Sequence, residues 1–137
     1  MSRGYTLDSF ALLAYLRQEP GYPRVLEVLQ GAQAGQWSVY LSLINYGEVL
    51  YISERLGGRR AVEETVRIVD NLPLEIVAVD RPLTFQAAHI KAHYRLSFAD
   101  AFTVALALEK GVTILTGDPE FQSVEGLVEV EWLKTAP

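Results

Sequence analysis

Apolar residues along the chain alternate between short runs rich in β-branched side chains and longer stretches in which they recur every three or four residues. The short runs are typical of buried strands, and the longer repeats are typical of amphipathic helices. Strands are predicted over residues 5–7, 37–43, 75–79 and 112–116, with a short one over 127–130. This alternation predicts an α/β fold in which helices cover a central parallel sheet of about four to five strands.

Helical repeats fill the intervals between these strands. Helices are predicted over residues 9–17, from Pro23 onward, over 45–56, around 62–69, from Pro82 to Tyr94 and from Ser97 to Glu109. Gly57 and Gly58 are expected to end one of these helices and Gly111 another, because glycine readily adopts the backbone conformation that closes a helix. No repeat or linker interrupts the pattern, so residues 1–137 are expected to form a single domain.

The composition narrows the classes of protein that fit this pattern. Half of the residues are hydrophobic and none is cysteine, which excludes a disulfide framework, a thiolate zinc site and cysteine catalysis. No apolar run approaches the ~20 residues that span a bilayer, and the residues near Met1 do not resemble a signal peptide. A cytoplasmic protein without a membrane segment is therefore expected.

The formal net charge of −5 argues at first sight against a nucleic-acid partner, because phosphate binding normally favours a basic surface. Four of the acids are candidates for one metal site, however, and setting these four aside leaves −1 of the −5. Bound cations would also stop that part of the surface from repelling phosphate. Contact with a nucleic acid is thus expected to be local rather than spread over a large basic face.

Four acidic residues lie where an ordinary domain has little use for them. Asp8 and Asp118 closely follow predicted strands, and ligand sites in open α/β sheets lie outside the carboxyl ends of the strands. Asp100 lies in the first turn of a strongly apolar helix, and Glu48 interrupts another apolar helical segment. An α/β fold can bring all four side chains to one end of the sheet.

Carboxylates that converge in a half-buried cleft repel one another, so either some of them are protonated or a cation is present. A hard divalent ion with oxygen ligands suits such a set, and Mg²⁺, with Mn²⁺ as a substitute, is the predicted ion. A site of this kind suits in-line attack of a metal-activated water on a phosphodiester. The acids therefore favour the hypothesis of a metal-dependent nuclease.

Each acid also has an ordinary structural interpretation. Asp8 fits a helix cap, Asp100 fits a favourable charge at a helix N-terminus, and Asp118 fits a turn before proline. Taken singly, these interpretations are the better ones. Glu48 is harder to explain in this way, because an acid within an apolar helical segment lowers stability unless it is satisfied. The four acids in combination favour the metal site.

The acids lie in four short segments, which are YTLDS (5–9), NYGEV (45–49), LSFADA (96–101) and ILTGDPEF (114–121). With these segments the sequence resembles the PIN-domain ribonucleases, and specifically the VapC-type toxins of prokaryotic toxin–antitoxin pairs. The resemblance spans almost the whole chain, and the order and spacing of the segments make it fairly specific. It implies a three-layer α/β/α fold around a parallel sheet and magnesium-dependent endonuclease activity on RNA.

The resemblance also implies roles for individual residues. The metal ligands, which are also the catalytic acids, would be Asp8, Glu48, Asp100 and Asp118. The hydroxyl groups of Thr116 and Ser9 would orient ligands or water. Thr116 would also count among the catalytic residues. Asn45 lies three residues before Glu48 on the same helical face and supports that carboxylate. An RNA substrate, a small antitoxin protein and a second copy in a homodimer are the implied partners.

His89 and His93 stand four residues apart, a spacing that can bind zinc. His89 shares a predicted apolar face with Phe85, and no third zinc ligand lies nearby in the sequence. A packed core histidine is therefore expected at this position rather than a metal ligand.

The basic side chains gather in two clusters. The larger comprises Arg55, Arg59, Arg60 and Arg67, and the smaller comprises Lys91 and Arg95. Glu63 and Arg67 have the spacing of an ordinary surface ion pair. A solvated helix face and a contact with an RNA backbone explain the larger cluster equally well.

Two other functions stay open from the sequence. One keeps the site but makes the protein an RNA-processing or DNA-acting nuclease without a toxic role. The other makes the fold a non-catalytic RNA-binding module whose acids are structural. Cleavage that requires a divalent ion would separate both kinds of nuclease from the module.

Overall fold

A parallel sheet of five strands forms the centre of the computed structural model, which describes residues 4–135. The strands are Gly4–Leu7 (β1), Ser38–Ser42 (β2), Glu75–Val77 (β3), Thr113–Thr116 (β4) and Val130–Trp132 (β5). They lie in the order β3-β2-β1-β4-β5, and each strand is parallel to its neighbours. The chain thus begins in the middle of the sheet and adds strands on both sides. The predicted parallel sheet is confirmed.

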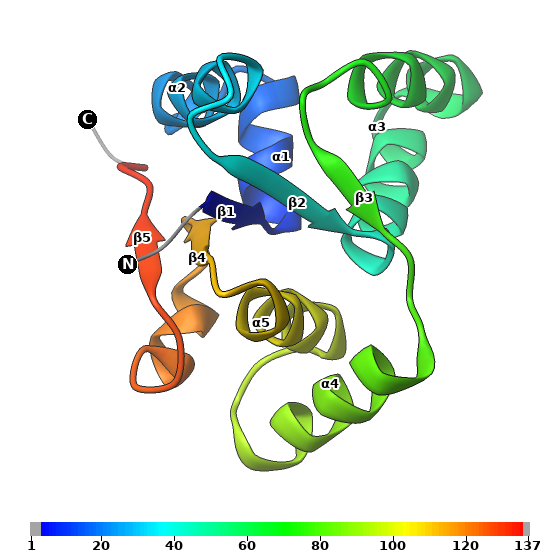
Figure 1. Ribbon diagram of the computed structural model, residues 1–137. Coiled ribbons are helices and arrows are strands. Elements are labelled where there is room, and N and C mark those ends of the chain that lie inside the picture. The colour runs from blue at the N-terminus through cyan, green and yellow to red at the C-terminus, as the bar shows by residue number, and fades with distance from the viewer. Residues whose placement is uncertain (1–3, 136–137) are drawn as a thin grey trace.

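Helices cover both faces of this sheet (Figure 1). They are Ser9–Leu16 (α1), Tyr22–Gln33 (α2), Leu43–Val69 (α3), Arg81–His93 (α4) and Phe98–Lys110 (α5), with a 3₁₀ helix over Pro119–Val124 (η1). In Figure 1, α1 and α2 lie above the sheet, and α5, with α4 outside it, lies below. The arrangement is the expected three-layer α/β/α fold.

Two hydrophobic clusters separate these layers, and the strands supply side chains to both. Leu115 of β4 packs with the residues of α1, α2 and α3, whereas Ile114 packs with those of α4, α5 and η1. Both side chains are fully buried, as the alternation of side chains along a strand covered on both faces requires. The central strands are therefore fixed from above and below, and so are the loops that follow their carboxyl ends.

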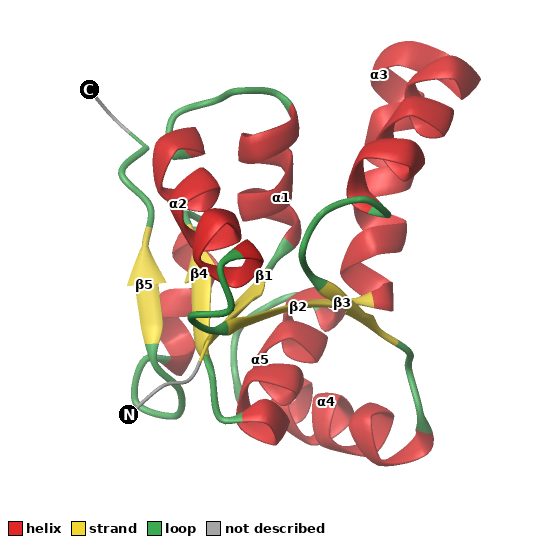
Figure 2. Cartoon of the chain, turned by 45° about the horizontal axis from the view of Figure 1, so that its top comes forward, coloured by secondary structure: helices red, strands yellow, loops and turns green. Residues whose placement is uncertain are grey.

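The longest helix, α3, consists of two helical stretches that meet at Gly58. This glycine has a φ of +73° and interrupts the helical conformation. The predicted break at Gly57 and Gly58 is therefore confirmed, and the second stretch follows the first without a loop between them. Figure 2 shows α3 as a long arm beside β3. Among the described residues, α3 included, no helix is long and apolar enough to cross a membrane.

The last part of the chain also departs from expectation. The predicted strand over 127–130 is wrong in its position, because β5 begins at Val130 and pairs its first residue with Ile114. Leu127 instead lies in the turn after η1, where its backbone N–H donates to the carbonyl oxygen of Val124. The 3₁₀ helix η1 directly follows Asp118, where the sequence predicts a turn before proline. Strand β5 comes after this helix and therefore begins closer to the C-terminus than predicted.

Candidate metal centre

The first acid of the site, Asp8, directly follows β1 and begins α1. Its Oδ1 accepts the backbone N–H of Ala11 at 2.8 Å, which caps the helix. Its Oδ2 accepts the hydroxyl of Thr116 at 2.5 Å. Asp8 is 1% exposed, so this carboxyl group is fixed at the carboxyl end of the sheet by two hydrogen bonds. The capping interpretation of Asp8 is confirmed, and one oxygen of the same carboxyl group also faces the end of β4.

The end of β4, which is next to β1 in the sheet, places the second acid. The hydroxyl of Thr116 donates to Asp8 and accepts the backbone N–H of Asp118 at 2.9 Å. The Oδ1 of Asp118 in turn accepts the backbone N–H of Glu120 at 3.0 Å and caps η1. Thr116 therefore links the two loops that carry Asp8 and Asp118, as expected of a hydroxyl that orients the acids.

The start of α5 places the third acid, and it introduces one that sequence reasoning missed. Ser97 caps α5 by accepting the backbone N–H of Asp100 at 3.2 Å, but the N–H of Ser97 donates to Glu120 at 3.0 Å. In a capping box, Asp100 would accept the backbone N–H of Ser97. Here Glu120, from another segment, accepts that N–H instead. Carboxylate oxygens of Asp100, Asp118 and Glu120 lie within 4.8 Å of one another. The signal for Glu120 was its place two residues after Asp118, inside the last matching segment.

Glu48 lies at the side of this cluster and is held through Ser9. The hydroxyl of Ser9, the residue next to Asp8, donates a very short hydrogen bond to a carboxylate oxygen of Glu48. Glu48 is half-buried and does not belong to the three acids that lie within 4.8 Å of one another. Its position within an apolar helical segment is explained, because the carboxylate has both a hydrogen-bond donor and access to water.

Asn45 is the centre of a buried hydrogen-bond network beneath the acids. Its Nδ2 donates to the Ser9 hydroxyl at 3.3 Å and to the carbonyl of Ala99 at 3.4 Å. Its Oδ1 accepts the hydroxyls of Ser42 at 2.5 Å and Thr103 at 2.8 Å. Within residues 4–135 Asn45 makes no direct hydrogen bond to Glu48, and it reaches that carboxylate through Ser9. The network therefore ties α1, β2, α3 and α5 together at one point.

Burial and mutual repulsion raise the pKa of two of the acids. Loss of hydration raises the pKa of Asp8 from 3.8 to about 7, and the charge of Asp118 adds to this rise against the lowering effect of the Thr116 hydrogen bond. The pKa of Asp100 rises from 3.8 to about 8. Burial is the main cause, and the negative charges of Asp8 and Asp118 also raise this pKa. Asp8, Asp100 and Asp118 therefore lie close enough to repel one another.

These shifts make the stability of the metal-free protein depend on pH. Between pH 4 and the raised pKa values, the folded protein holds protons on Asp8 and Asp100 that the unfolded chain has released. The free energy of unfolding therefore falls as the pH rises from about 4 to about 8, and it levels off above the raised pKa values. At neutral pH the charges of these acids lower the stability of the folded protein. A metal-binding site without its ion has this effect, whereas a structural ion pair does not.

The donor set fits a hard divalent cation. The ion pairs found within residues 4–135 leave out all five acids, Asp8, Glu48, Asp100, Asp118 and Glu120. Only oxygen donors line the site, which suits Mg²⁺ or Mn²⁺ better than zinc or copper. Each carboxylate oxygen that already accepts one hydrogen bond keeps a second lone pair for an ion.

The histidines lie away from this site, and the expectation for His89 is wrong. Both His89 and His93 are exposed on α4, with ring centroids 4.6 Å apart. The helix buries Leu83, Ala87 and Ile90 instead, so the apolar face is rotated from the predicted one. Phe85, which was expected on that face, is 62% exposed.

Arg67 is also paired differently from the prediction. Its guanidinium lies 3.9 Å from Glu64, at i, i+3 spacing, rather than against Glu63. Both side chains are largely exposed, so the pair contributes little to stability.

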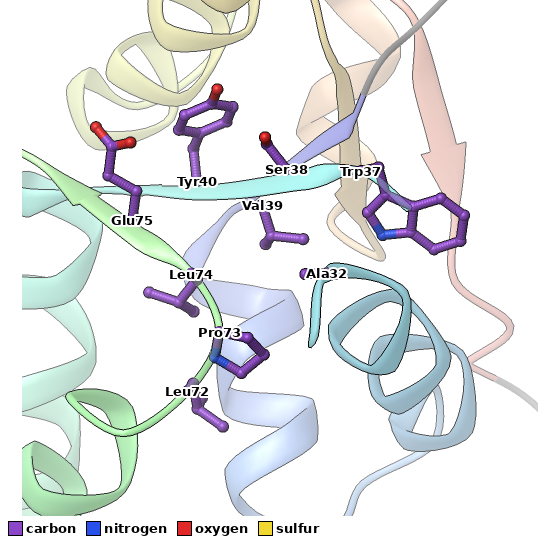
Figure 3. Close-up of a pocket in the computed structure, with 9 residues that line it drawn as sticks. All are labelled: Ala32, Trp37, Ser38, Val39, Tyr40, Leu72, Pro73, Leu74 and Glu75. Carbon is purple, nitrogen blue, oxygen red and sulfur yellow. The ribbon is translucent and has the colours of Figure 1, made fainter. Parts of the chain in front are cut away.

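One hollow of about 360 Å³ lies at the opposite end of the sheet (Figure 3). Its walls include Ser38 and Glu75, the first residues of β2 and β3. In Figure 3, Tyr40 projects to one side of β2 and Val39 to the other. The acids follow the carboxyl ends of the strands, so this hollow is separate from the candidate metal centre.

Comparisons with known proteins agree with this architecture. The family model described as "PIN domain" matches residues 5–127. Among solved structures, VapBC2 from Rickettsia felis, bound to a promoter DNA fragment, aligns with a TM-score of 0.75 at 17% identity, over 95% of this chain and 98% of that one. DNA-bound VapBC from Salmonella typhimurium aligns with a TM-score of 0.75 at 18% identity, over 96% and 98%.

A third solved structure is described as a toxin that cleaves the sarcin-ricin loop. VapC20 from Mycobacterium tuberculosis, a "Sarcin-Ricin loop cleaving toxin", aligns with a TM-score of 0.70 at 22% identity, over 93% of this chain and 99% of that one. Comparison with curated protein sequences gives no match. At these identities the structural likeness establishes the shared fold, and the family model establishes the relationship.

Proposed function

Since the chain belongs to the PIN-domain family, we propose that it is a divalent-metal-dependent endoribonuclease that hydrolyses RNA phosphodiester bonds. One observation carries the proposal. Acids from the end of β1, the start of α5 and the loop after β4 meet at one end of the sheet, where they repel one another. An assembly that costs stability, and that has no cation partner within residues 4–135, is explained by a bound metal ion.

The residues that would hold Mg²⁺ or Mn²⁺ are Asp8, Glu48, Asp100 and Asp118, with Glu120 as an additional carboxylate. A bound ion of this kind supplies an activated water and neutralises charge on a phosphodiester. Glu48 contributes from the side of the cluster, where Ser9 fixes its carboxylate. Glu120 contributes from the exposed side, where the N–H of Ser97 fixes it.

The other residues of the site keep the acids in place. Thr116 fixes the carboxyl group of Asp8 and the backbone of Asp118 with a single hydroxyl. Asn45 fixes Ser9 and the first turn of α5, where Asp100 lies. These residues act on the reaction through the acids and not on the substrate, because they are fully buried.

We propose further that the protein is the toxin of a toxin–antitoxin pair. Solved structures that share its fold over nearly their whole length include VapBC complexes and VapC20, which is described as a toxin that cleaves the sarcin-ricin loop. Its partners would then be a structured RNA, a small antitoxin protein and a second copy of the chain in a homodimer. Residues 1–137 would act as a single nuclease domain in the cytoplasm.

Cleavage of RNA by the purified protein tests the proposed function. Structured RNA, incubated with the protein in Mg²⁺, should give discrete fragments, and a chelator should prevent their formation because the acids then lack their ion. A DNA of the same sequence should remain intact. Cleavage that continues in the chelator would contradict the metal mechanism, and cleavage of the DNA instead would make the protein a DNA-acting nuclease.

A further inference from the structure

The stretch from Arg81 to Ala99, which covers α4 and the start of α5, is basic in an otherwise acidic protein. It contains none of the 17 acidic residues of the chain, but it contains Arg81, Lys91 and Arg95 as well as both histidines. Within residues 4–135 none of these three cations forms an ion pair. Their charge is therefore available to an anionic ligand.

The exposed face of α4 also carries a row of rings at a spacing of four residues. Phe85 is 62% exposed, and the guanidinium carbon of Arg81 lies 4.8 Å from its ring centroid. His89 and His93 follow, with their ring centroids 4.6 Å apart. Four residues of helix correspond to an axial rise of about 6 Å, so the rings form a ladder along the helix. We call these four residues, Arg81, Phe85, His89 and His93, the α4 ladder.

The ladder is followed closely along the chain by the helix that carries Asp100. Four residues connect the end of α4 to Phe98, the first residue of α5, and Phe98 is itself 47% exposed and two positions before Asp100. Two hydrogen bonds fasten this connection to η1. The carbonyl of Arg95 accepts the hydroxyl of Ser123 at 3.1 Å, and the N–H of Ser97 donates to Glu120 at 3.0 Å. The α4 ladder is thus joined rigidly to the metal centre.

From this arrangement we infer that the α4 ladder binds single-stranded RNA and guides it to the acids. Exposed rings stack on bases of any sequence, and unpaired cations beside them bind the phosphate backbone. The inference rests on the proposed nuclease function and adds the surface that holds the substrate next to the cut. It assigns RNA contact to the α4 ladder rather than to the larger basic cluster on α3.

The charge of the segment favours RNA over a second copy of the chain as the occupant. In a two-fold contact the same patch meets itself. Such a contact through α4 would bring the basic segment of one copy against the basic segment of the other. Binding of a polyanion such as RNA neutralises the basic segment, whereas self-association through α4 brings like charges together.

The chain offers a matched control for the ladder. On α3 the guanidinium of Arg55 lies 4.8 Å from the ring of Tyr51, which is 48% exposed. This pair repeats the geometry of Arg81 and Phe85, but Glu48 and Glu54 share its helical segment. Loss of either ring removes an exposed side chain and should leave the fold intact.

Binding of a fluorescein-labelled oligouridylate to the full chain, measured in a chelator so that no cleavage occurs, tests the inference. Phe85→Ala and the pair His89→Ala with His93→Ala should each weaken binding about tenfold. Tyr51→Ala should stay within about twofold of the unmodified protein. Arg81→Gln should lower the slope of log affinity against log salt by about one.

Equal binding by the ladder variants and the unmodified protein would overturn the inference, as would an equal loss in Tyr51→Ala. Sedimentation of the same samples supplies the other outcome. If Phe85→Ala converts a dimer to monomers while the affinity per protomer is unchanged, a second copy covers α4 and the inference is wrong. Because binding is measured without a metal ion, failure to cleave any RNA would contradict the proposed function and leave this result standing.

Discussion

Asp118→Asn should lower the rate of magnesium-dependent RNA cleavage by roughly a hundredfold to a thousandfold, the range seen when one group that stabilises the reacting charge is removed. The amide oxygen can still accept the N–H of Glu120, so the start of η1 should keep its geometry. The change therefore removes a charge from the acidic cluster with little loss of structure. Initial rates of fragment formation at saturating Mg²⁺ measure the effect.

The matched control for this prediction is Glu63→Gln. Glu63 is an exposed acid on the second half of α3, far along the chain from the acidic cluster, and its loss alters the net charge by the same amount. The control should keep most of the activity. Comparable rates for Asp118→Asn and the unmodified protein would show that this carboxylate takes no part in cleavage, and an equal loss in the control would point to a general effect of charge on RNA binding.

Asn45→Ala should lower the free energy of unfolding by about 3 kcal/mol, because it leaves buried hydrogen-bonding groups without partners and opens a small cavity. The hydroxyls of Ser42 and Thr103 would lose their common acceptor, and that of Ser9 would lose a donor. Asn45 is 0% exposed, so water cannot readily replace the lost bonds. Urea unfolding followed by circular dichroism measures the change.

Asn71→Ala provides the comparison for Asn45. The Nδ2 of Asn71 also donates a hydrogen bond, at 2.7 Å to the carbonyl of Arg67, but it does so at the exposed surface. Its replacement should change the free energy of unfolding by less than about 0.5 kcal/mol. If Asn45→Ala proved as mild as Asn71→Ala, the buried network would not be holding the helices together.

The central part of the fold could be predicted from the sequence because its signals are local and strong. The short run over 112–116 is rich in β-branched and apolar residues, which predicts a strand that is covered on both faces of the sheet. All four residues of β4 are buried, as this pattern predicts. The same reasoning failed near the C-terminus. There β5 has three residues of intermediate burial, and its position is set by pairing with β4 and by the 3₁₀ helix before it, neither of which leaves a periodic pattern.

The individual acids were predictable as a group, although each one also serves the local structure. Asp8 caps α1 and Asp118 caps η1, so the simple interpretation of each was physically correct and did not exclude the other role. Glu120 escaped notice because its contact with Ser97 joins residues 23 positions apart. The exposure of His89 was missed for a similar reason, since packing against α5 decides which face of α4 is buried.

Thermal unfolding of the unmodified protein and of Asp100→Asn, each in a chelator and in Mn²⁺ at pH 8, tests most directly whether these acids share a cation. In the chelator the variant should unfold at the higher temperature, because it lacks one of the charges that repel one another. In Mn²⁺ the unmodified protein should gain several degrees through binding to the folded state, roughly as RT ln(1 + [L]/Kd) requires, while the variant gains much less. An equal response of both proteins to Mn²⁺, or no response of the unmodified protein, would contradict a shared metal site.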